Sequence, residues 1–186
     1  FYKKTIQYRM KFLTYSLLLL TYLSASTLNL SMSSSPSRLN PILANDSASS
    51  EISDWLFNGL FKYDKNGNPT VELAKSYNFE TPTKLIIKLR EDVLWHDNVK
   101  LTSKDIIFTY EKIIDPKVFN SIKSNFQEVQ SVKALDDYTI EVIYKNPYFK
   151  ALETWMVGIL PYHLLKDEKD LMTSSFNKNP IGTGSY

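Results

Sequence analysis

The stretch from Leu89 to Pro116, LREDVLWHDNVKLTSKDIIFTYEKIIDP, decides the fold, and its centre is the sequence Trp95-His96-Asp97-Asn98. A histidine beside a carboxylate can belong to a metal site, but zinc requires further ligands at defined spacing. The only other histidine, His163, lies 67 residues further along the chain. Asp and Asn tolerate the backbone conformations that turns require. We therefore interpret this stretch as a structural turn that is covered by Trp95.

A helix is predicted directly after this turn. Thr102 stands three residues before Asp105, which is the spacing of a capping box. Apolar residues then recur at helical spacing until Asp115-Pro116, where proline ends the pattern. These apolar residues are Ile106, Tyr110, Ile113 and Ile114.

Strands are predicted on both sides of this unit, because apolar and polar residues alternate there. The pair Asn66-Gly67 predicts a hairpin turn within residues 60–73. Residues 84–90 form one predicted strand, and residues 129–135 and 138–145 form two more around Asp136-Asp137. Further elements are a strand over residues 27–32, a loop up to about residue 47, and helices over residues 47–59, 149–156 and 161–165.

The first 26 residues resemble a secretory signal peptide. They contain four basic residues and no acidic one, with an apolar run from Phe12 to Leu23 and small residues after it. The run is short for a membrane span, and an uncleaved anchor or a buried helix remains the alternative. Residues 27–186 contain 18 basic and 20 acidic residues, which disfavours binding to nucleic acid. The sequence has no cysteine that could carry a disulfide, a metal or a lipid.

The sequence contains none of the common catalytic patterns. We find no Gly-x-Ser-x-Gly motif, no His-Glu-x-x-His motif and no phosphate-binding loop. The paired acids fall at predicted turns. We therefore expect no catalytic residue, no metal site and no cofactor. Most aromatic residues are expected in the core. Trp155 is an exception, because it precedes Gly158 at a joint where it could line a cleft.

Several stretches, taken in order, resemble the family 5 extracellular solute-binding proteins, which are the oligopeptide, dipeptide and nickel receptors of ABC importers. The stretches are LNPILANDSASSEISDWLFNGLFKYDKNGN (39–68), VELAKSYNF (71–79), IIKLREDVLWHDNVKLTSKDIIFTYEKIIDP (86–116), VKALDDYTIEVIYKNPY (132–148), GILPYHLL (158–165) and NPIGTGSY (179–186). Asn98 replaces a glycine that is usual in the family, and Asn also accepts left-handed geometry.

The resemblance implies an α/β fold of the type II periplasmic-binding-protein-like clamshell, of which this chain would be the N-terminal portion. Residues 1–26 would be upstream residues and a signal peptide, and residues 27–58 would begin lobe I. Residues 59–157 would form an inserted small lobe, and residues 158–186 would return to lobe I. The acidic residue with which peptide receptors of the family hold the ligand's amino terminus would lie outside this chain.

The resemblance also implies a ligand-binding segment, namely Asn45, Asp46, Ser47 and Ala48. In oligopeptide receptors the matching residues present backbone groups to the peptide as an added strand, which gives affinity without reading side chains. Alternatively the same residues cap the following helix, and both roles are compatible. Phe119 and Trp155 are weaker candidates for the pocket.

The expected function is that of a periplasmic, monomeric binding protein that closes its lobes on a peptide and delivers it to an inner-membrane permease. One alternative is a nickel or metallophore receptor of the same family. The alternative from another class is an exported peptidase with catalytic residues outside this chain.

Overall fold

The computed structural model describes residues 31, 32 and 34–186, of which residues 34–186 belong to one compact unit. The predicted signal peptide and nearly all of the predicted strand over residues 27–32 therefore lie outside the described residues. Among the described residues, no helix has both the length and the apolar character that a membrane crossing requires.

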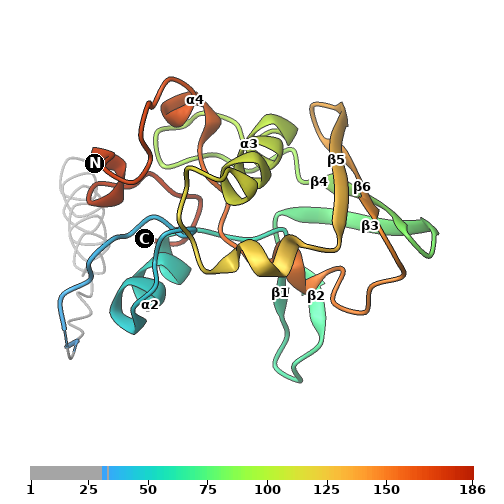
Figure 1. Ribbon diagram of the computed structural model, residues 1–186, viewed down its shortest axis with the longest axis horizontal. Coiled ribbons are helices and arrows are strands. Elements are labelled where there is room, and N and C mark those ends of the chain that lie inside the picture. Colours follow the sequence, from blue (N-terminus) through green and yellow to red (C-terminus); the bar gives the residue numbers. More distant parts are fainter. Residues whose placement is uncertain (1–30, 33) are drawn as a thin grey trace, which may run out of the picture. The chain divides into compact units, whose positions relative to one another are not determined.

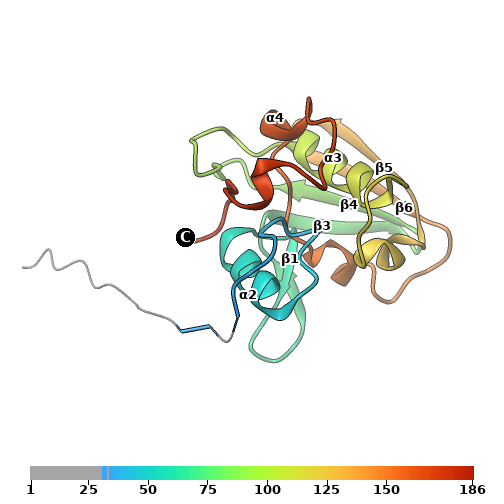
Figure 2. The same ribbon diagram turned by 60° about the vertical axis from the view of Figure 1, so that its left-hand side comes forward.

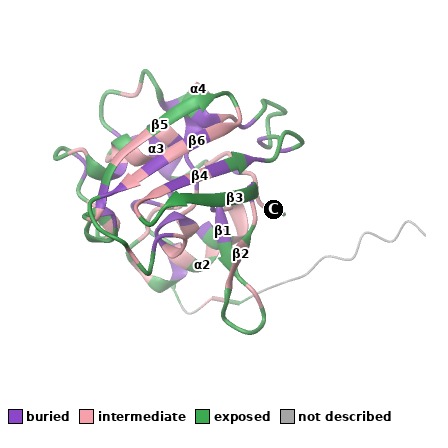
Figure 3. Cartoon of the chain, turned by 90° about the vertical axis from the view of Figure 1, so that its right-hand side faces the viewer, coloured by how far each residue is buried: buried purple, intermediate pink, exposed green. Residues whose placement is uncertain are grey.

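A four-stranded antiparallel sheet with the strand order β3-β4-β6-β5 forms one side of this unit (Figure 1). Its strands are β3 (Ala74–Thr81), β4 (Lys84–Leu89), β5 (Val129–Asp136) and β6 (Thr139–Tyr144). Alternate residues of β4 and β6 are buried, so the predicted alternation is confirmed for both strands (Figure 3). The strand β3 was not predicted. Only Ala74 of it is buried, because β3 is an edge strand.

The helix α3 (Ser103–Ile114) packs against this sheet (Figure 2). Its buried residues include Ile106 and Ile113, as the helical spacing predicts. The predicted capping box is present, and the backbone N–H of Thr102 donates to the carboxylate of Asp105 at 2.8 Å. Asn98 has a φ of 67°, which confirms the left-handed turn.

A second, smaller sheet is the hairpin of β1 (Phe61–Tyr63) and β2 (Pro69–Val71), with Gly67 in the turn as predicted. The helix α2 (Ser47–Leu56) precedes this hairpin. The predicted helix over residues 149–156 is shorter than expected, because only the 3-10 helix η2 (Glu153–Met156) forms after a series of turns. The remaining elements are the 3-10 helices η1 (Ile122–Phe126) and η3 (Ser175–Asn177) and the helix α4 (Tyr162–Leu165).

A single cluster of buried apolar side chains extends from Ile42 to Phe176 and includes residues of β1, α3, α4 and all four strands of the larger sheet, while α2 packs against it through the half-buried Leu56. Contacts between residues far apart in the sequence join its ends. The buried Asn40 donates to the side chain of Asn177 at 3.1 Å, and Asn177 donates to the carbonyl of Leu171 at 2.8 Å. The start and the end of the described chain are thereby held on the same core.

Candidate functional site

The N-terminus of α2 is fixed by Asp46. The carboxylate of Asp46 accepts a bond from the backbone N–H of Ser49 at 2.9 Å, which is an N-cap interaction. The hydroxyl groups of Ser37 and Ser49 donate to the same carboxylate at 2.5 and 2.7 Å. These bonds, that of Ser37 first, lower the pKa of Asp46 to about 2. The capping role of the segment is therefore confirmed.

The residues just before this helix present free backbone groups. The N–H groups of Asn45 and Asp46 and the carbonyls of Ala44 and Asn45 form no hydrogen bond with any other described residue. Asp46 has extended backbone angles, with φ −112° and ψ 155°, and the side chains of Asn45 and Ser47 are exposed. Exposed backbone groups of this kind are satisfied by water or by a ligand. The free backbone groups of this segment can therefore form hydrogen bonds with another chain.

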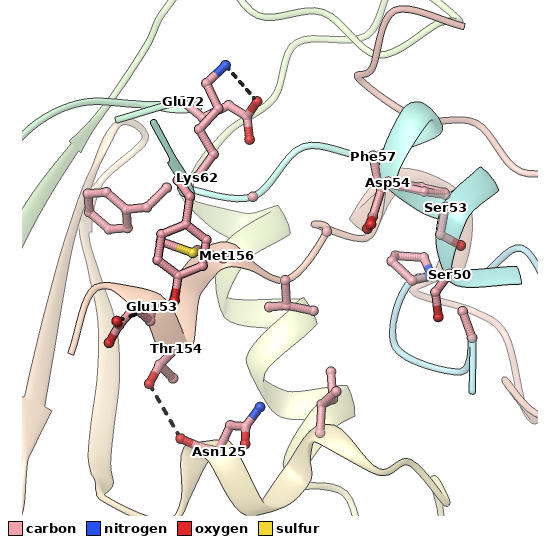
Figure 4. Close-up of a pocket in the computed structure, with 18 of the residues that line it drawn as sticks. Ser50, Ser53, Asp54, Phe57, Lys62, Glu72, Asn125, Glu153, Thr154 and Met156 are labelled. Carbon is pink, nitrogen blue, oxygen red and sulfur yellow. Dashed lines mark hydrogen bonds and ion pairs between the residues drawn. The ribbon is translucent and has the colours of Figure 1, made fainter. Parts of the chain in front are cut away.

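Ala44 of this segment lines a cavity of about 530 Å³. Figure 4 shows this cavity. It lies between α2 on one side and the start of β1, η1 and η2 on the other. The aromatic residues beside it are Phe57, Phe61, Tyr63 and Phe126, of which only Tyr63 is exposed. Its polar lining residues include Asp54, Lys62, Glu72 and Glu153. We call this space the α2 cavity.

The charges of the α2 cavity are only partly compensated. Lys62 forms an ion pair with Glu72 at 3.2 Å, and Asn58 donates to the same carboxylate at 3.1 Å. Glu153 accepts a bond from the hydroxyl of Tyr63 at 3.3 Å. Burial raises the pKa of Asp54, and no hydrogen bond or neighbouring charge opposes this effect. The ionised cavity therefore carries more negative than positive charge.

Two chain segments run side by side along the edge of the cavity. The N–H of Leu60 donates to the carbonyl of Trp155 at 2.8 Å, and the N–H of Ile159 donates to the carbonyl of Asn58 at 3.1 Å. A Cβ atom at Gly59 would lie 2.6 Å from the backbone of Met156, so this approach depends on glycine. The lobe boundaries predicted near residues 58 and 157 fall in these two segments.

None of the six predicted binding residues lines the α2 cavity. Asn45 to Ala48 adjoin it, although Ala48 itself is buried. Phe119 lies outside the cavity with 81% of its side chain exposed. The prediction that Trp155 lines a cleft is wrong. Only 1% of Trp155 is exposed, and its indole N–H donates to the hydroxyl of Tyr144 at 3.0 Å. Its side chain is part of the core rather than the wall of a cleft.

Both histidines form contacts that hold parts of the fold together. The ring of His96 bonds to the backbone of Gly182 and Gly184, at 3.3 and 2.9 Å. His163 contacts Asp97 at 2.7 Å, a proximity that their separation in the sequence did not predict. No group of three or more histidine or acidic residues within the described part of the chain is placed to hold a metal ion.

The sequence did not predict that the acidic residues of the cavity would lie at a site. Asp54, Glu72 and Glu153 are separated by long stretches of chain and match no motif. Only the folded chain brings them to one cavity.

Comparisons with known proteins define first the class and then the family. The solved structure of NikZ from Campylobacter jejuni in complex with Ni(L-His) is 38% identical, with a TM-score of 0.74 over 82% of this chain and 31% of that one. The structure of the oligopeptide-binding protein AppA from Bacillus subtilis in complex with a nonapeptide is 29% identical, with a TM-score of 0.73 over 80% of this chain and 31% of that one. The fold is therefore part of a periplasmic-binding-protein-like α/β fold, as predicted.

The family profile "Bacterial extracellular solute-binding proteins, family 5 Middle" matches residues 68–186. In sequence, AppA from Bacillus subtilis is 31% identical over 161 residues, which are 81% of this chain and 29% of AppA. The periplasmic oligopeptide-binding protein OppA from Escherichia coli is 30% identical over 122 residues, or 55% of this chain and 22% of OppA. The chain belongs to the family 5 extracellular solute-binding proteins, and it spans about 30% of the length of such relatives.

Proposed function

We propose that this chain is part of the substrate-binding component of an ABC importer, and that its ligand is a peptide. The protein binds the peptide by closing two lobes around it and then delivers it to a permease in the inner membrane. It makes and breaks no covalent bonds. Its affinity depends on contacts that both lobes provide, because a ligand favours the closed form only through contacts that the open form lacks.

The observation that carries this proposal is the set of unpaired backbone N–H and carbonyl groups at Ala44, Asn45 and Asp46, beside the α2 cavity. A peptide that lies along this segment would form hydrogen bonds with its N–H and carbonyl groups, as in strand addition. Main-chain pairing is independent of the ligand's sequence, and the neighbouring cavity has room for a side chain. The names of the relatives AppA and OppA, both oligopeptide-binding proteins, support the same ligand class.

The proposed location is the periplasm, which the protein would reach by means of a signal peptide within residues 1–26. We further propose that the protein acts as a monomer. Mass spectrometry of the exported protein tests whether the signal peptide is removed. A mature N-terminus near Thr27 is expected, whereas retention of the first 26 residues would contradict it.

A nickel chelate is the second candidate ligand, because NikZ, whose structure contains Ni(L-His), is 38% identical to this chain. A chelated metal brings some of its own ligands, so a receptor for it needs few histidines. Isothermal calorimetry on the product of the complete open reading frame separates the two candidates. Binding of short peptides but not of nickel with L-histidine is expected, and the opposite result would favour the nickel receptor. Incubation of the same protein with a peptide tests the peptidase alternative. The peptide is expected to remain intact, whereas its cleavage would indicate a peptidase.

The backbone pairing is tested by a matched pair of variants at one position. Asn45→Pro removes the N–H group of residue 45, and peptide affinity is expected to fall roughly tenfold because a ligand hydrogen bond is lost. Asn45→Ala keeps the N–H group and is expected to bind almost as the parent protein does. Equal weakening in both variants would show that the asparagine side chain, and not the main chain, is recognised. Thermal unfolding of both variants confirms that they fold.

A further inference from the structure

The hydroxyl group of Ser49 joins three parts of the chain next to the segment with free backbone groups. Ser49 is fully buried, with 0% of its surface exposed. Its hydroxyl donates to the carboxylate of Asp46 at 2.7 Å, and it accepts bonds from the N–H groups of Ser37 and Arg38 at 2.8 and 3.2 Å. A serine hydroxyl has one hydrogen and two lone pairs. All three are therefore used in these contacts.

The same contacts fix Asp46 through both oxygens of its carboxylate. Oδ1 accepts a bond from the backbone N–H of Ser49, and Oδ2 accepts bonds from the hydroxyl groups of Ser37 and Ser49. The carbonyl of Asp46 accepts a bond from the N–H of Ser50 at 2.9 Å. Hydrogen bonds to an ionised carboxylate are stronger than those between neutral groups. The backbone of Asp46, with its free N–H, is thus held in one conformation.

The other end of the segment is fixed by Asn40, which is also fully buried. The N–H groups of residues 42–44 all bond to Asn40, two of them to its carbonyl at 2.9 Å and one to its side chain at 3.2 Å. After these three N–H groups, that of Asn45 is the first one that is free. Residues 44–46 are therefore held between two buried polar residues, Asn40 before them and Ser49 after them.

We propose that Ser49 is a positioning residue for peptide binding. Its side chain does not touch the peptide, but its hydroxyl keeps the free backbone groups of residues 44–46 in the conformation that pairs with the ligand. This inference rests on the proposed function, since it assumes that a peptide pairs with this segment. A segment that is ordered before binding loses less conformational freedom when the ligand arrives. Without the hydroxyl, only a fraction of the free protein would be competent to bind, and the affinity would fall by that fraction.

The test compares Ser49→Ala with the parent protein, both as the product of the complete open reading frame. The dissociation constant of pentaalanine is measured by calorimetry. Ser49→Ala is expected to bind it about fivefold more weakly, which corresponds to the loss of one hydrogen bond of average strength. Thermal unfolding confirms that the variant folds.

Ser103→Ala is the matched control. Ser103 is also buried in the first turn of a helix, α3, and its hydroxyl donates to the backbone carbonyl of Asp136 at 2.7 Å. It has no contact with residues 44–46, so its affinity for pentaalanine should stay within about twofold of the parent, as for independent sites. Equal weakening in both variants would show a general effect of lost stability and would refute the positioning role.

A second measurement separates positioning from stability. Pentaalanine peptides with N-methylalanine at each position in turn lack one N–H group each. At the position that pairs with residues 44–46, N-methylation is expected to weaken binding about fivefold in the parent and in Ser103→Ala. In Ser49→Ala the same change should cost at most about twofold, because the pairing is already impaired and the two effects are not additive.

Ser37→Ala provides the test if Ser49→Ala does not fold. Ser37 is exposed, and this variant removes only the hydroxyl that donates to Asp46 at 2.5 Å. It is expected to bind pentaalanine about threefold more weakly and to show the same reduced cost of N-methylation. Parent-like affinity together with the full cost of N-methylation would contradict the proposal.

The possible failures are distinguishable. If pentaalanine does not bind to the parent protein, the proposed function itself is wrong. If it binds equally to the parent and to Ser49→Ala, or if N-methylation costs the same in both, the peptide-binding function stands and the positioning role of Ser49 is refuted.

Discussion

At the scale of single residues, the absence of one methyl group controls how the C-terminal segment packs. A Cβ atom on Gly182 would lie 1.8 Å from the carbonyl oxygen of Leu56, at the end of α2. Backbone atoms cannot move aside as a flexible side chain can. The same segment bonds to Leu56 through the N–H of Gly184 at 2.8 Å, so displacing it would also break a hydrogen bond.

We therefore expect Gly182→Ala to lower the free energy of unfolding by roughly 2–3 kcal/mol, the upper part of the range for overpacking. Urea unfolding at constant temperature measures this change. Gly67→Asn is the control, because Gly67 has open space around it and asparagine accepts its positive φ of 81°. Its effect should stay within about 0.5 kcal/mol. Equal stability of Gly182→Ala and the parent protein would show that this close packing is absent.

Individual residues differ in how far the sequence could predict them. The left-handed conformation of Asn98 and the capping role of Asp46 were predictable, because both follow from the residue type and its near neighbours. The exposure of Asp54 to the α2 cavity was not predictable. It depends on residues from β1, η1 and η2, which approach α2 only after folding. The burial of Trp155 was missed for the same reason, since its partner Tyr144 lies in β6.

At the scale of elements, alternation in burial made some strands predictable and its absence hid another. The strands β4 and β6 have one buried face each, so their alternation is visible in the sequence. The edge strand β3 is almost fully exposed and shows no such pattern. In η2, Trp155 has non-helical angles of φ −97° and ψ 17°, so the predicted helix does not continue. Hydrophobic spacing alone could not indicate this break.

The two helices α3 and α4 are connected through the carboxylate of Asp105, which is buried at 3% exposure. It accepts bonds from the N–H groups of Thr102 and Tyr162, at 2.8 and 2.9 Å. Asp105→Ala would leave both donors without this acceptor. We expect the free energy of unfolding to fall by about 2–3 kcal/mol. Chemical unfolding at pH 7 measures the loss, and a change below about 0.5 kcal/mol would show that water replaces the carboxylate.

A comparison of Asp105→Asn with the parent protein at two pH values tests the pKa of Asp105. Burial raises the pKa of Asp105 in the folded protein above its ordinary value of 3.8. Between these two pKa values the folded state binds more protons than the unfolded state, so the contribution of Asp105 to stability falls as the pH rises. Asp105→Asn lacks this titration. The stability deficit of the variant relative to the parent should therefore be larger at pH 4 than at pH 7, and a deficit that grows with pH would contradict the raised pKa.

At the scale of the whole molecule, contacts between distant parts of the chain join segments within one predicted lobe and across the predicted lobe boundary. Asn40 and Asn177 are 137 residues apart, both in segments assigned to lobe I, and share a buried hydrogen bond. Thr109 of α3 accepts a bond from the N–H of Leu160 at 2.8 Å, across the proposed boundary near residue 157. The sequence suggested the boundaries by resemblance alone, and it carries no local signal for such contacts. Within the described residues, one core serves both segments.

This shared core predicts that residues 34–186 unfold together. Asn177→Ala removes a buried partner of Asn40 and of the carbonyl of Leu171, so it should destabilise the protein by roughly 2 kcal/mol. Because the core is continuous, hydrogen exchange in the complete product should show an equal loss of protection in α2 and in the distant strands β4 and β6. The exposed substitution Lys178→Ala is the control and should change neither region. A loss confined to α2 and residues 158–186 would mean that residues 59–157 are an independent folding unit, and that the boundaries near residues 58 and 157 separate two domains with their own stabilities.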